Sequence, residues 1–296
     1  MIEHYAVARF LTIPTVQALR RAANHAARRD ASAKERRRAD ADPACLAVGW
    51  RGGKACWIGD TDPGSPLPHV TDLNDAYRAR KKATGARDRK GNAVALHCLV
   101  GVSPAWLEET GSIHDVDDPG NPRVRKLLSA AIRWGQEAFG KGAVLAARMD
   151  LDDTGGGIVD LIVTPVHPLK LGRSKKAEPT VSVARGLDLL AKKHERPRQE
   201  GMAAGVDSWT EYAQQHLDPQ LKRGEPARET GRRHVPPTAY RQRMQELEQE
   251  RARLEAQIEA LHELLRLWMK YAESAVEVLD QIGEAPSLPQ PATPEM

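Results

Sequence analysis

The sequence predicts an α+β fold in which one sheet is covered by helices, followed by a basic helical region and a C-terminal coiled coil. Two observations in the first 170 residues predict the sheet and its helices: short β-branched segments recur, and Ala-rich or amphipathic helical segments lie between them. A third observation predicts the rest: a stretch rich in Lys, Arg and Pro is followed by a long heptad repeat.

The first elements are a strand, a helix and a hairpin. Residues 5–10 (YAVARF) alternate in polarity as a strand does, and the composition of residues 15–38, rich in Ala and Arg, predicts a helix. Residues 44–59 (ACLAVGWRGGKACWIG) predict two short strands. We expect these strands to form a hairpin across Gly52 and Gly53, because a glycine pair suits a tight turn.

The same order then repeats. A short charged helix is predicted around residues 72–91, and a strand over residues 92–103 (NAVALHCLVGVS). Residues 123–140 (RVRKLLSAAIRWGQEAFG) are apolar at helical spacing and end in the glycine that typically closes a helix. Two adjacent strands follow, over residues 143–153 and 157–166, and they predict a final hairpin.

The composition points to an anionic partner. The chain of 296 residues suits about two domains. It has 44 Lys and Arg against 40 Asp and Glu, a net charge of +4, and a sequence pI of about 9.0. Aromatic residues make up 4% and the mean hydropathy is -0.54, so the apolar residues must be concentrated in one part of the chain. Nucleic acid is the first partner that this charge pattern suggests.

Cysteine usage and hydropathy indicate the compartment. Cys45, Cys56 and Cys98 form no CxxC pair and leave one over in any disulfide scheme, which is typical of a reducing environment. No segment approaches the roughly 20 apolar residues that cross a bilayer, and the start lacks the pattern of a signal peptide. The sequence therefore predicts a cytoplasmic protein.

Four regions are expected along the chain. They are an α+β domain over residues 1–170, a basic DNA-contacting extension over 171–237, a coiled-coil helix over 238–283 and a disordered tail over 284–296. The extension carries clusters of Lys and Arg interrupted by Pro, which we expect to follow an anionic surface. The heptad seam over residues 240–282 predicts pairing of two chains as a homodimer, or of the helix with its own domain.

The seam itself is regular. Its positions alternate by three and four residues, and only Arg251 interrupts the apolar character. The apolar members are Met244, Leu247, Leu254, Ile258, Leu261, Leu265, Trp268, Ala272, Ala275, Leu279 and Ile282.

An acidic, glycine-rich turn is the first candidate site. Residues 148–166 (RMDLDDTGGGIVDLIVTPV) contain Asp150, Asp152, Asp153 and Asp160. Strand periodicity puts the first two on one side, with the last on the facing strand. Oxygen ligands favour Mg²⁺ or Mn²⁺, ions that assist phosphoryl chemistry. The alternative is a hairpin in which Asp and Gly only satisfy the turn geometry. Spacing alone leaves both open.

The Arg-rich first helix holds the second candidate site. His25 and Arg28 are three residues apart, so they share a helix face and can both meet one phosphate. Arg20, Arg21 and Arg29 are expected to contact the DNA backbone.

His97 alternates with apolar residues in the strand predicted over residues 92–103. This pattern favours a core histidine over a metal ligand.

Taken together, the segments resemble the MobV-type plasmid mobilisation relaxases, also called the Mob/Pre plasmid recombination family, over about residues 4–240. The start resembles the family's opening strand and its first helix with an HxxR element, which is His25 and Arg28 here. Residues 87–107 resemble the strand that ends at a Ser-Pro helix start. Residues 208–244 resemble the segment that leads into a coiled coil.

The resemblance implies roles for residues. His25 is expected to be the nucleophile, with Arg28 orienting or neutralising the phosphate. Tyrosine serves in other relaxases, so Tyr5 and Tyr77 are the alternative nucleophiles. In the basic segment, the cations expected to contact DNA are Lys222, Arg223, Arg232 and Arg233.

The sequence departs from the family at its metal motif, HxDE...PHxH. Asp150 stands for the first histidine, Asp153 for the glutamate and Asp160 for the last histidine, while Gly157 or Ile158 takes the middle position. Either the aspartates hold Mn²⁺ or Mg²⁺ as harder ligands, or only the DNA-binding scaffold is kept.

The main hypothesis is a relaxase that binds plasmid origin-of-transfer DNA and nicks one strand by metal-assisted transesterification. The second is an inactive DNA-binding accessory protein that dimerises through its coiled coil. The third is a scaffold with no role in nucleic-acid binding.

Overall fold

The computed structural model describes residues 3–26, 45–48, 56–57, 73–114, 120–151, 156–170, 176–224 and 237–283. It divides into two compact units, Met1–Thr230 and Gly231–Met296. The elements of the first unit are β1 (Tyr5–Ile13), α1 (Val16–Ala26), β2 (Cys45–Val48), β3 (Cys56–Trp57), α3 (Leu73–Thr84), β4 (Ala95–Val102), α4 (Pro104–Glu108), α5 (Pro122–Phe139), β5 (Val144–Asp150), β6 (Ile158–Val163), β7 (Val166–Lys170), β8 (Ala177–Val181), α6 (Val183–Lys193), η1 (Arg198–Glu200), α7 (Gly201–His216) and β9 (Lys222–Arg223). The second unit contains α9 (Pro237–Gly283).

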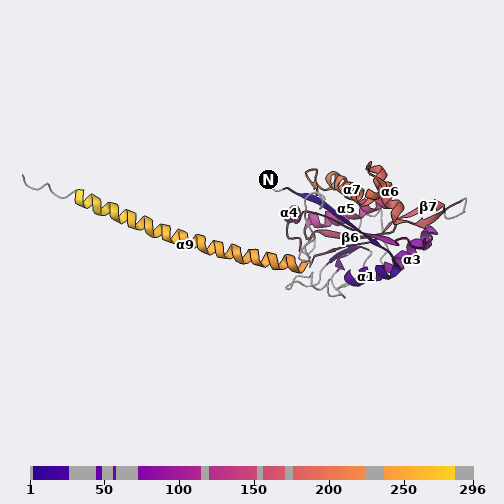
Figure 1. Cartoon of the computed structure of the whole chain (residues 1–296), viewed down its shortest axis with the longest axis horizontal. Helices are drawn as coiled ribbons and strands as arrows, with labels where there is room; N and C mark the ends of the chain where they lie inside the picture. The colour runs from indigo at the N-terminus through magenta and orange to yellow at the C-terminus, as the bar shows by residue number, and fades with distance from the viewer. Residues whose placement is uncertain are drawn as a thin grey trace, which may run out of the picture. The chain divides into compact units, whose positions relative to one another are not determined.

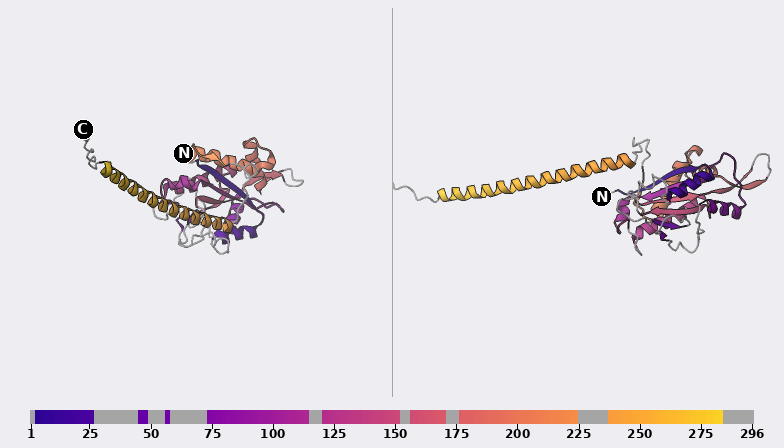
Figure 2. Two further views of the ribbon diagram at one scale, coloured as in Figure 1. Left: turned by 60° about the vertical axis from the view of Figure 1, so that its left-hand side comes forward. Right: turned by 90° about the horizontal axis from the view of Figure 1, so that it is seen from below.

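One sheet with helices on both sides organises the first unit, which confirms the predicted α+β class. Its seven strands run in the order β3-β2-β5-β6-β4-β1-β9, and β7 and β8 form a separate antiparallel pair. Figure 1 shows α5, α6 and α7 on one side of the strands and α1 and α3 on the other. Seen from below in Figure 2, α1 lies over the strands.

The apolar core lies mainly between the sheet and α5, α6 and α7. Leu96, Cys98 and Val100 of β4 face this side, because alternate residues of a strand point the same way. Trp134 and Trp209 meet edge to face with ring centroids 5.6 Å apart. Their indole N–H groups are also satisfied: Trp134 Nε1 donates to Ser208 Oγ and Trp209 Nε1 donates to the carbonyl of Gly101.

The expected helix over residues 123–140 forms as α5, and its ends explain its bounds. The side chain of Asn121 caps the first turn by accepting hydrogen bonds from the backbone N–H groups of Arg123 and Val124. Pro122 suits the first helical position, where no backbone donor is needed. Gly140 closes the helix with a φ of 104°, a conformation that glycine adopts at little cost.

Residues 176–224 belong to the same compact unit as the strands that precede them. Helices α6 and α7 pack on the main core through apolar residues such as Leu190, Ala204 and Trp209. At Gly205, an added Cβ would lie 2.7 Å from the Phe10 ring, so glycine permits the close approach of α7 to β1. The Lys and Arg residues that the structure describes between 176 and 224 therefore belong to this unit, together with helices that help to form its core.

The predicted hairpin over residues 44–59 is wrong in its pairing. Strands β2 and β3 pair in parallel, with Cys45 opposite Cys56 and Leu46 opposite Trp57. A two-residue glycine turn joins antiparallel strands, whereas parallel strands need a longer crossover connection. The partner of β2 on its other side is β5, to which it is antiparallel.

Strand β5 contains one extra residue relative to β6. Val144 lies opposite Val163, whereas Ala146 lies opposite Ile162, which makes a β-bulge at Leu145. Leu145 and Ala146 consequently both face the side covered by α1 and α3. From there on, the alternation of β5 is shifted by one residue.

The second unit consists, where it is described, of the single helix α9. The prediction of a helix over residues 238–283 is confirmed by its bounds, Pro237–Gly283. Its described apolar seam residues, from Leu247 to Ile282, are exposed. None of the described helices is long and apolar enough to cross a membrane. The tail predicted to be disordered, 284–296, lies outside the described residues.

Candidate functional site: the partly exposed half of the sheet

The face of the sheet toward α1 and α3 has two different halves. Over one half, Ile13, Ala95 and Ile162 are buried with apolar residues of the two helices. Over the other half, Val7 and Leu11 of β1 are large apolar side chains that remain exposed, and Arg9 between them is exposed as well. This second half, which we call the open half, carries the polar residues of β4, β5 and β6.

Strand register sets a charged row across the open half. Arg9 of β1 lies opposite Leu99 of β4, which lies opposite Asp160 of β6, which in turn lies opposite Arg148 of β5. Residues opposite each other in neighbouring strands point to the same face of a sheet. The row therefore brings two arginines and one aspartate, from three distant parts of the sequence, onto one surface.

Arg148 is the buried cation of this row. Its side chain is 4% exposed, and its Nε donates a hydrogen bond to Asp150 Oδ1 at 2.5 Å. The Asp150 side chain is only 10% exposed. Two charges taken out of water in this way stabilise each other strongly, and each would be costly to leave alone.

His97 and Asp160 form a second pair on the same face. His97 Nε2 lies 2.6 Å from Asp160 Oδ1, and the side chains are 19% and 24% exposed. A carboxylate that holds an imidazole fixes its tautomer and orientation, which is the arrangement used for general acid and base work. The sequence pattern predicted a core histidine at this position. The structure instead places His97 in the open half, with a hydrogen-bond partner 63 residues further along the chain.

The sequence-predicted residues of the first helix are only partly described. Arg20 and Arg21 lie on α1 and are exposed. The backbone of His25 belongs to the last turn of α1, whereas Arg28 and Arg29 lie outside the described residues. Helix α1 packs on the same face of the sheet that carries the open half.

The two alternative nucleophiles are both held by acidic partners. The Tyr77 side chain is 2% exposed, and its hydroxyl donates a hydrogen bond to Asp88. Burial, and secondly that hydrogen bond, raise the pKa of the Tyr77 phenol. The Tyr5 hydroxyl donates to Glu3 at 2.6 Å. Tyr77 is therefore too buried to reach a phosphate.

Two of the predicted DNA-contacting cations already have carboxylate partners. Lys222 of β9 is paired with Glu3, and Arg223 Nε lies 2.5 Å from Asp207 Oδ1. Arg232 and Arg233 lie outside the described residues. The two cations of β9 therefore form ion pairs that hold this edge strand against Glu3 and Asp207.

The described part of the predicted metal motif does not form a metal site. Asp150 is hydrogen-bonded to Arg148 and Asp160 to His97, which leaves a guanidinium beside the carboxylates that would have to bind a cation. Over the described ranges, no three His, Cys, Asp or Glu side chains cluster closely enough to hold an ion. Asp152 and Asp153 lie outside these ranges, so the four-aspartate site stays a prediction.

Comparison with known proteins decides the fold. A Mn-bound MobM relaxase domain (MOBV; Mob_Pre) in complex with 22 nucleotides of plasmid pMV158 oriT DNA is similar at a TM-score of 0.50. The two chains are 14% identical, and the match covers 80% of this chain and 98% of that one. The chain has the fold of that relaxase domain. A second Mn-bound structure of the MobM domain on the same DNA gives a TM-score of 0.49 at 14% identity, covering 81% of this chain and 99% of that chain.

The relaxase fold that the sequence resemblance implied is thus confirmed. No protein-family model and no curated protein matches the chain. At 14% identity, the shared feature is the arrangement of strands and helices, and the function has to be argued from this chain's own residues.

Proposed function

We propose that this chain is a plasmid mobilisation protein that binds origin-of-transfer DNA on the open half of its sheet. The observation that supports this most strongly is the charged row from Arg9 to Arg148, on a partly exposed surface of a relaxase fold. The similar MobM domains are bound to oriT DNA, and the chain carries a net charge of +4.

The surface suits a single DNA strand. Val7 and Leu11 offer apolar area against which bases can pack, and Arg9 between them offers a charge to the backbone. Arg148 is held in place by Asp150, which compensates its charge, so the pair adds a fixed dipole under the open half, and the exposed positive charge of the row is that of Arg9. A preorganised dipole of this kind can stabilise a phosphate without any rearrangement of the protein.

Nicking of one strand is the second part of the proposal. His25 would attack the phosphorus of the scissile phosphodiester, with Arg28 beside it, so that a P–N bond forms, the P–O bond to the 3′ oxygen breaks and the 5′ phosphate stays attached to the protein. His97, held by Asp160, is placed to accept or donate a proton on the same face. The similar MobM structures contain Mn, and a divalent ion held by Asp150, Asp152, Asp153 and Asp160 remains part of this proposal.

One observation favours the alternative, an accessory protein that binds DNA without cutting it. The two described aspartates of the motif are engaged by Arg148 and His97. In that reading, Arg9 supplies the exposed positive charge of the site, and the protein needs no metal to bind DNA.

Both the nickase and the accessory protein would form a dimer through residues 240–282. The exposed seam of α9 repeats by three and four residues, which is the pattern that pairs two helices. Light scattering after size-exclusion chromatography should give twice the chain mass. Leu261→Asp, which puts a charge into the seam, should return the protein to a monomer.

The deciding experiment uses supercoiled plasmid that carries the cognate mobilisation region, with Mn²⁺, Mg²⁺ or EDTA. The variants are His25→Ala and Asp160→Ala, and Arg78→Gln on the exposed face of α3 is the matched control. Relaxed DNA with protein on its 5′ end, lost with EDTA and in both variants, would establish the metal-assisted nickase. Tight, salt-dependent binding without relaxation would establish the accessory protein. Absence of binding to any DNA would overturn both.

A further inference from the structure

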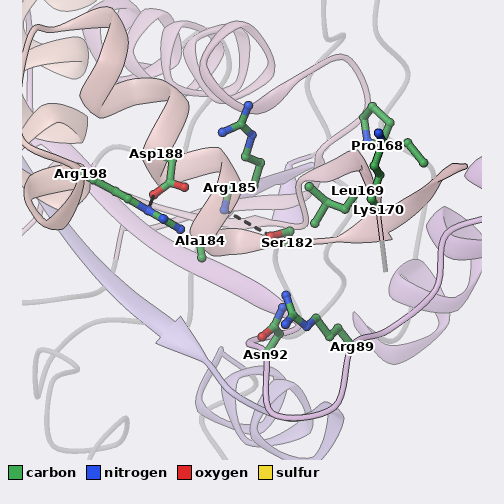
Figure 3. A pocket seen from close by; sticks show the side chains of 11 residues that line it. Arg89, Asn92, Pro168, Leu169, Lys170, Ser182, Ala184, Arg185, Asp188 and Arg198 are labelled. Atoms are coloured by element: carbon green, nitrogen blue, oxygen red, sulfur yellow. Dashed lines mark hydrogen bonds and ion pairs between the residues drawn. The ribbon is translucent and has the colours of Figure 1, made fainter. Parts of the chain in front are cut away.

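A basic pocket lies at the other end of the sheet from the open half. It has a volume of about 480 Å³ and is lined by residues of three segments: the turn before β4, the β7–β8 pair, and the region from the start of α6 to η1. Figure 3 shows Arg89 and Asn92 on one side of it, with Ser182, Ala184 and Asp188 on the other.

The charge in this pocket is mostly uncompensated. Arg198 is paired with Asp188 at 2.9 Å, as Figure 3 shows. Arg89, Lys170 and Arg185 also line the pocket, and the side chains of these three residues form no ion pair or hydrogen bond with any other part of the chain that the structure describes. An excess of three positive charges around one hollow attracts a multiply charged anion.

The backbone adds to this potential. Helix α6 begins at the pocket, and Ser182 caps it by accepting a hydrogen bond from the N–H of Arg185 at 3.2 Å. No acidic residue lies in the first turn of α6, so the positive end of the helix dipole is not neutralised there. The charge of Arg185 is also felt by His167 of β7. Burial, and secondly the charge of Arg185, lower the pKa of the His167 imidazole.

We propose that this pocket is a second nucleic-acid site, which binds backbone phosphates of the DNA that flanks the segment on the open half. This inference rests on the proposed function. The pocket begins at the turn before Ala95, and the open half reaches Gly101 on the same strand. Six residues of strand span about 20 Å, so a single strand has to extend over this distance to reach from the far edge of the open half into the pocket. A DNA longer than this reaches both sites at once, and a shorter one does not.

The test compares two triple variants. Arg89→Gln, Lys170→Gln and Arg185→Gln together remove the unpaired charge of the pocket. Lys141→Gln, Lys192→Gln and Lys193→Gln remove the same charge from exposed positions, two of them at the far end of α6. Both triples should melt within about 2 °C of the unchanged protein, because exposed substitutions away from buried networks have small effects.

Affinity for cognate single-stranded oligonucleotides of 3 and 24 nucleotides is measured by fluorescence anisotropy over a range of salt. We expect the pocket triple to bind the longer DNA at least about tenfold more weakly and to flatten the log–log salt dependence by about two, while the control triple stays within about twofold. The 3-nucleotide DNA, which is too short to reach both sites, should not distinguish the variants. Equal salt slopes and affinities of the two triples for the longer DNA would overturn the inference and leave the proposed function standing.

Inorganic tripolyphosphate tests the pocket without DNA. In ¹⁵N-labelled protein, it should shift the amide signals of Gly186 and Leu187 in the control triple but not in the pocket triple. The same shifts in both triples would exclude the pocket. Shifts that depend on the pocket, in a protein that binds no DNA of either length, would support an anion site and overturn the proposed function.

Discussion

The two faces of the central sheet are made by the same strands, yet they hold different chemistry. On the face toward α5 and α7, Val159, Leu161 and Val163 of β6 are fully buried. On the other face of the same strand, Asp160 meets His97 and lies opposite Arg148. The side chains of β6 that point toward α5 and α7 stabilise the fold, and those that point the other way belong to the site, because successive residues of a strand point to opposite faces.

The separation of the two faces predicts that the site contributes to stability only through its buried ion pair. Arg148→Met should lower the free energy of unfolding by about 3–5 kcal/mol, because it leaves the Asp150 carboxylate buried without its cation. Urea unfolding followed by circular dichroism measures this loss. Arg9→Met, in the same row but exposed, is the control and should change it by less than about 0.5 kcal/mol. Equal effects of the two substitutions would mean that Arg148 is not buried as described.

A pair of apolar substitutions compares the faces directly. Leu161→Ala should cost about 2–5 kcal/mol, because the side chain is fully buried and its removal leaves a cavity. Leu11→Ala should cost less than about 1 kcal/mol, since that side chain is 40% exposed. The same urea titration gives both values. Similar losses would show that the open half is covered in solution.

The smallest expected effect is a pH dependence of the protein's stability, caused by Asp207 of α7. Burial opposes ionisation of Asp207 in α7, but hydrogen bonds from Arg196 and Arg223 outweigh it, so the pKa of Asp207 is lowered. A lowered carboxyl pKa adds stability above the unfolded value of about 3.9 and loses it as pH falls through the folded value.

Asp207→Asn should therefore reduce the melting temperature at pH 7 and have a diminishing effect as the pH is lowered below about 4. Melting curves at several pH values measure this, with Asp75→Asn as the control, because both side chains of the Asp75–Arg78 pair are exposed. A difference between unchanged protein and Asp207→Asn that stays constant from pH 7 to pH 3 would contradict the role of the Asp207 charge.

Helices and strands that are specified by short sequence patterns could be predicted from the sequence. Helix α5 could be recognised from its apolar spacing and its closing Gly140, and β4 and β6 from alternation and β-branched residues. The pairing of β2 with β3 was not predictable in this way, because Gly52 and Gly53 fit a hairpin turn as well as any loop. Strand partners are chosen by the packing of the whole sheet.

The site was predictable only in part, because its contacts cross long sequence distances. Asp150 and Asp160 were found from their crowding near a glycine-rich turn. Arg148 shares the face of Asp150 by the strand period of two, so the sequence contained a signal for it. No signal in the sequence linked His97 to Asp160, because only the register of β4 against β6 brings these two residues together.

The bulge in β5 has a consequence at the level of the gene. Loss of codon 145 alone would leave an unbroken strand in which Val144 still lies opposite Val163 and Ala146 opposite Ile162, so every later residue of β5 would keep its partner and its face. Arg148 would remain opposite Asp160, and only the Leu145 side chain would be lost from the apolar layer beneath α1 and α3. We therefore expect lineages of this protein to tolerate in-frame loss of that codon with the charged row unchanged.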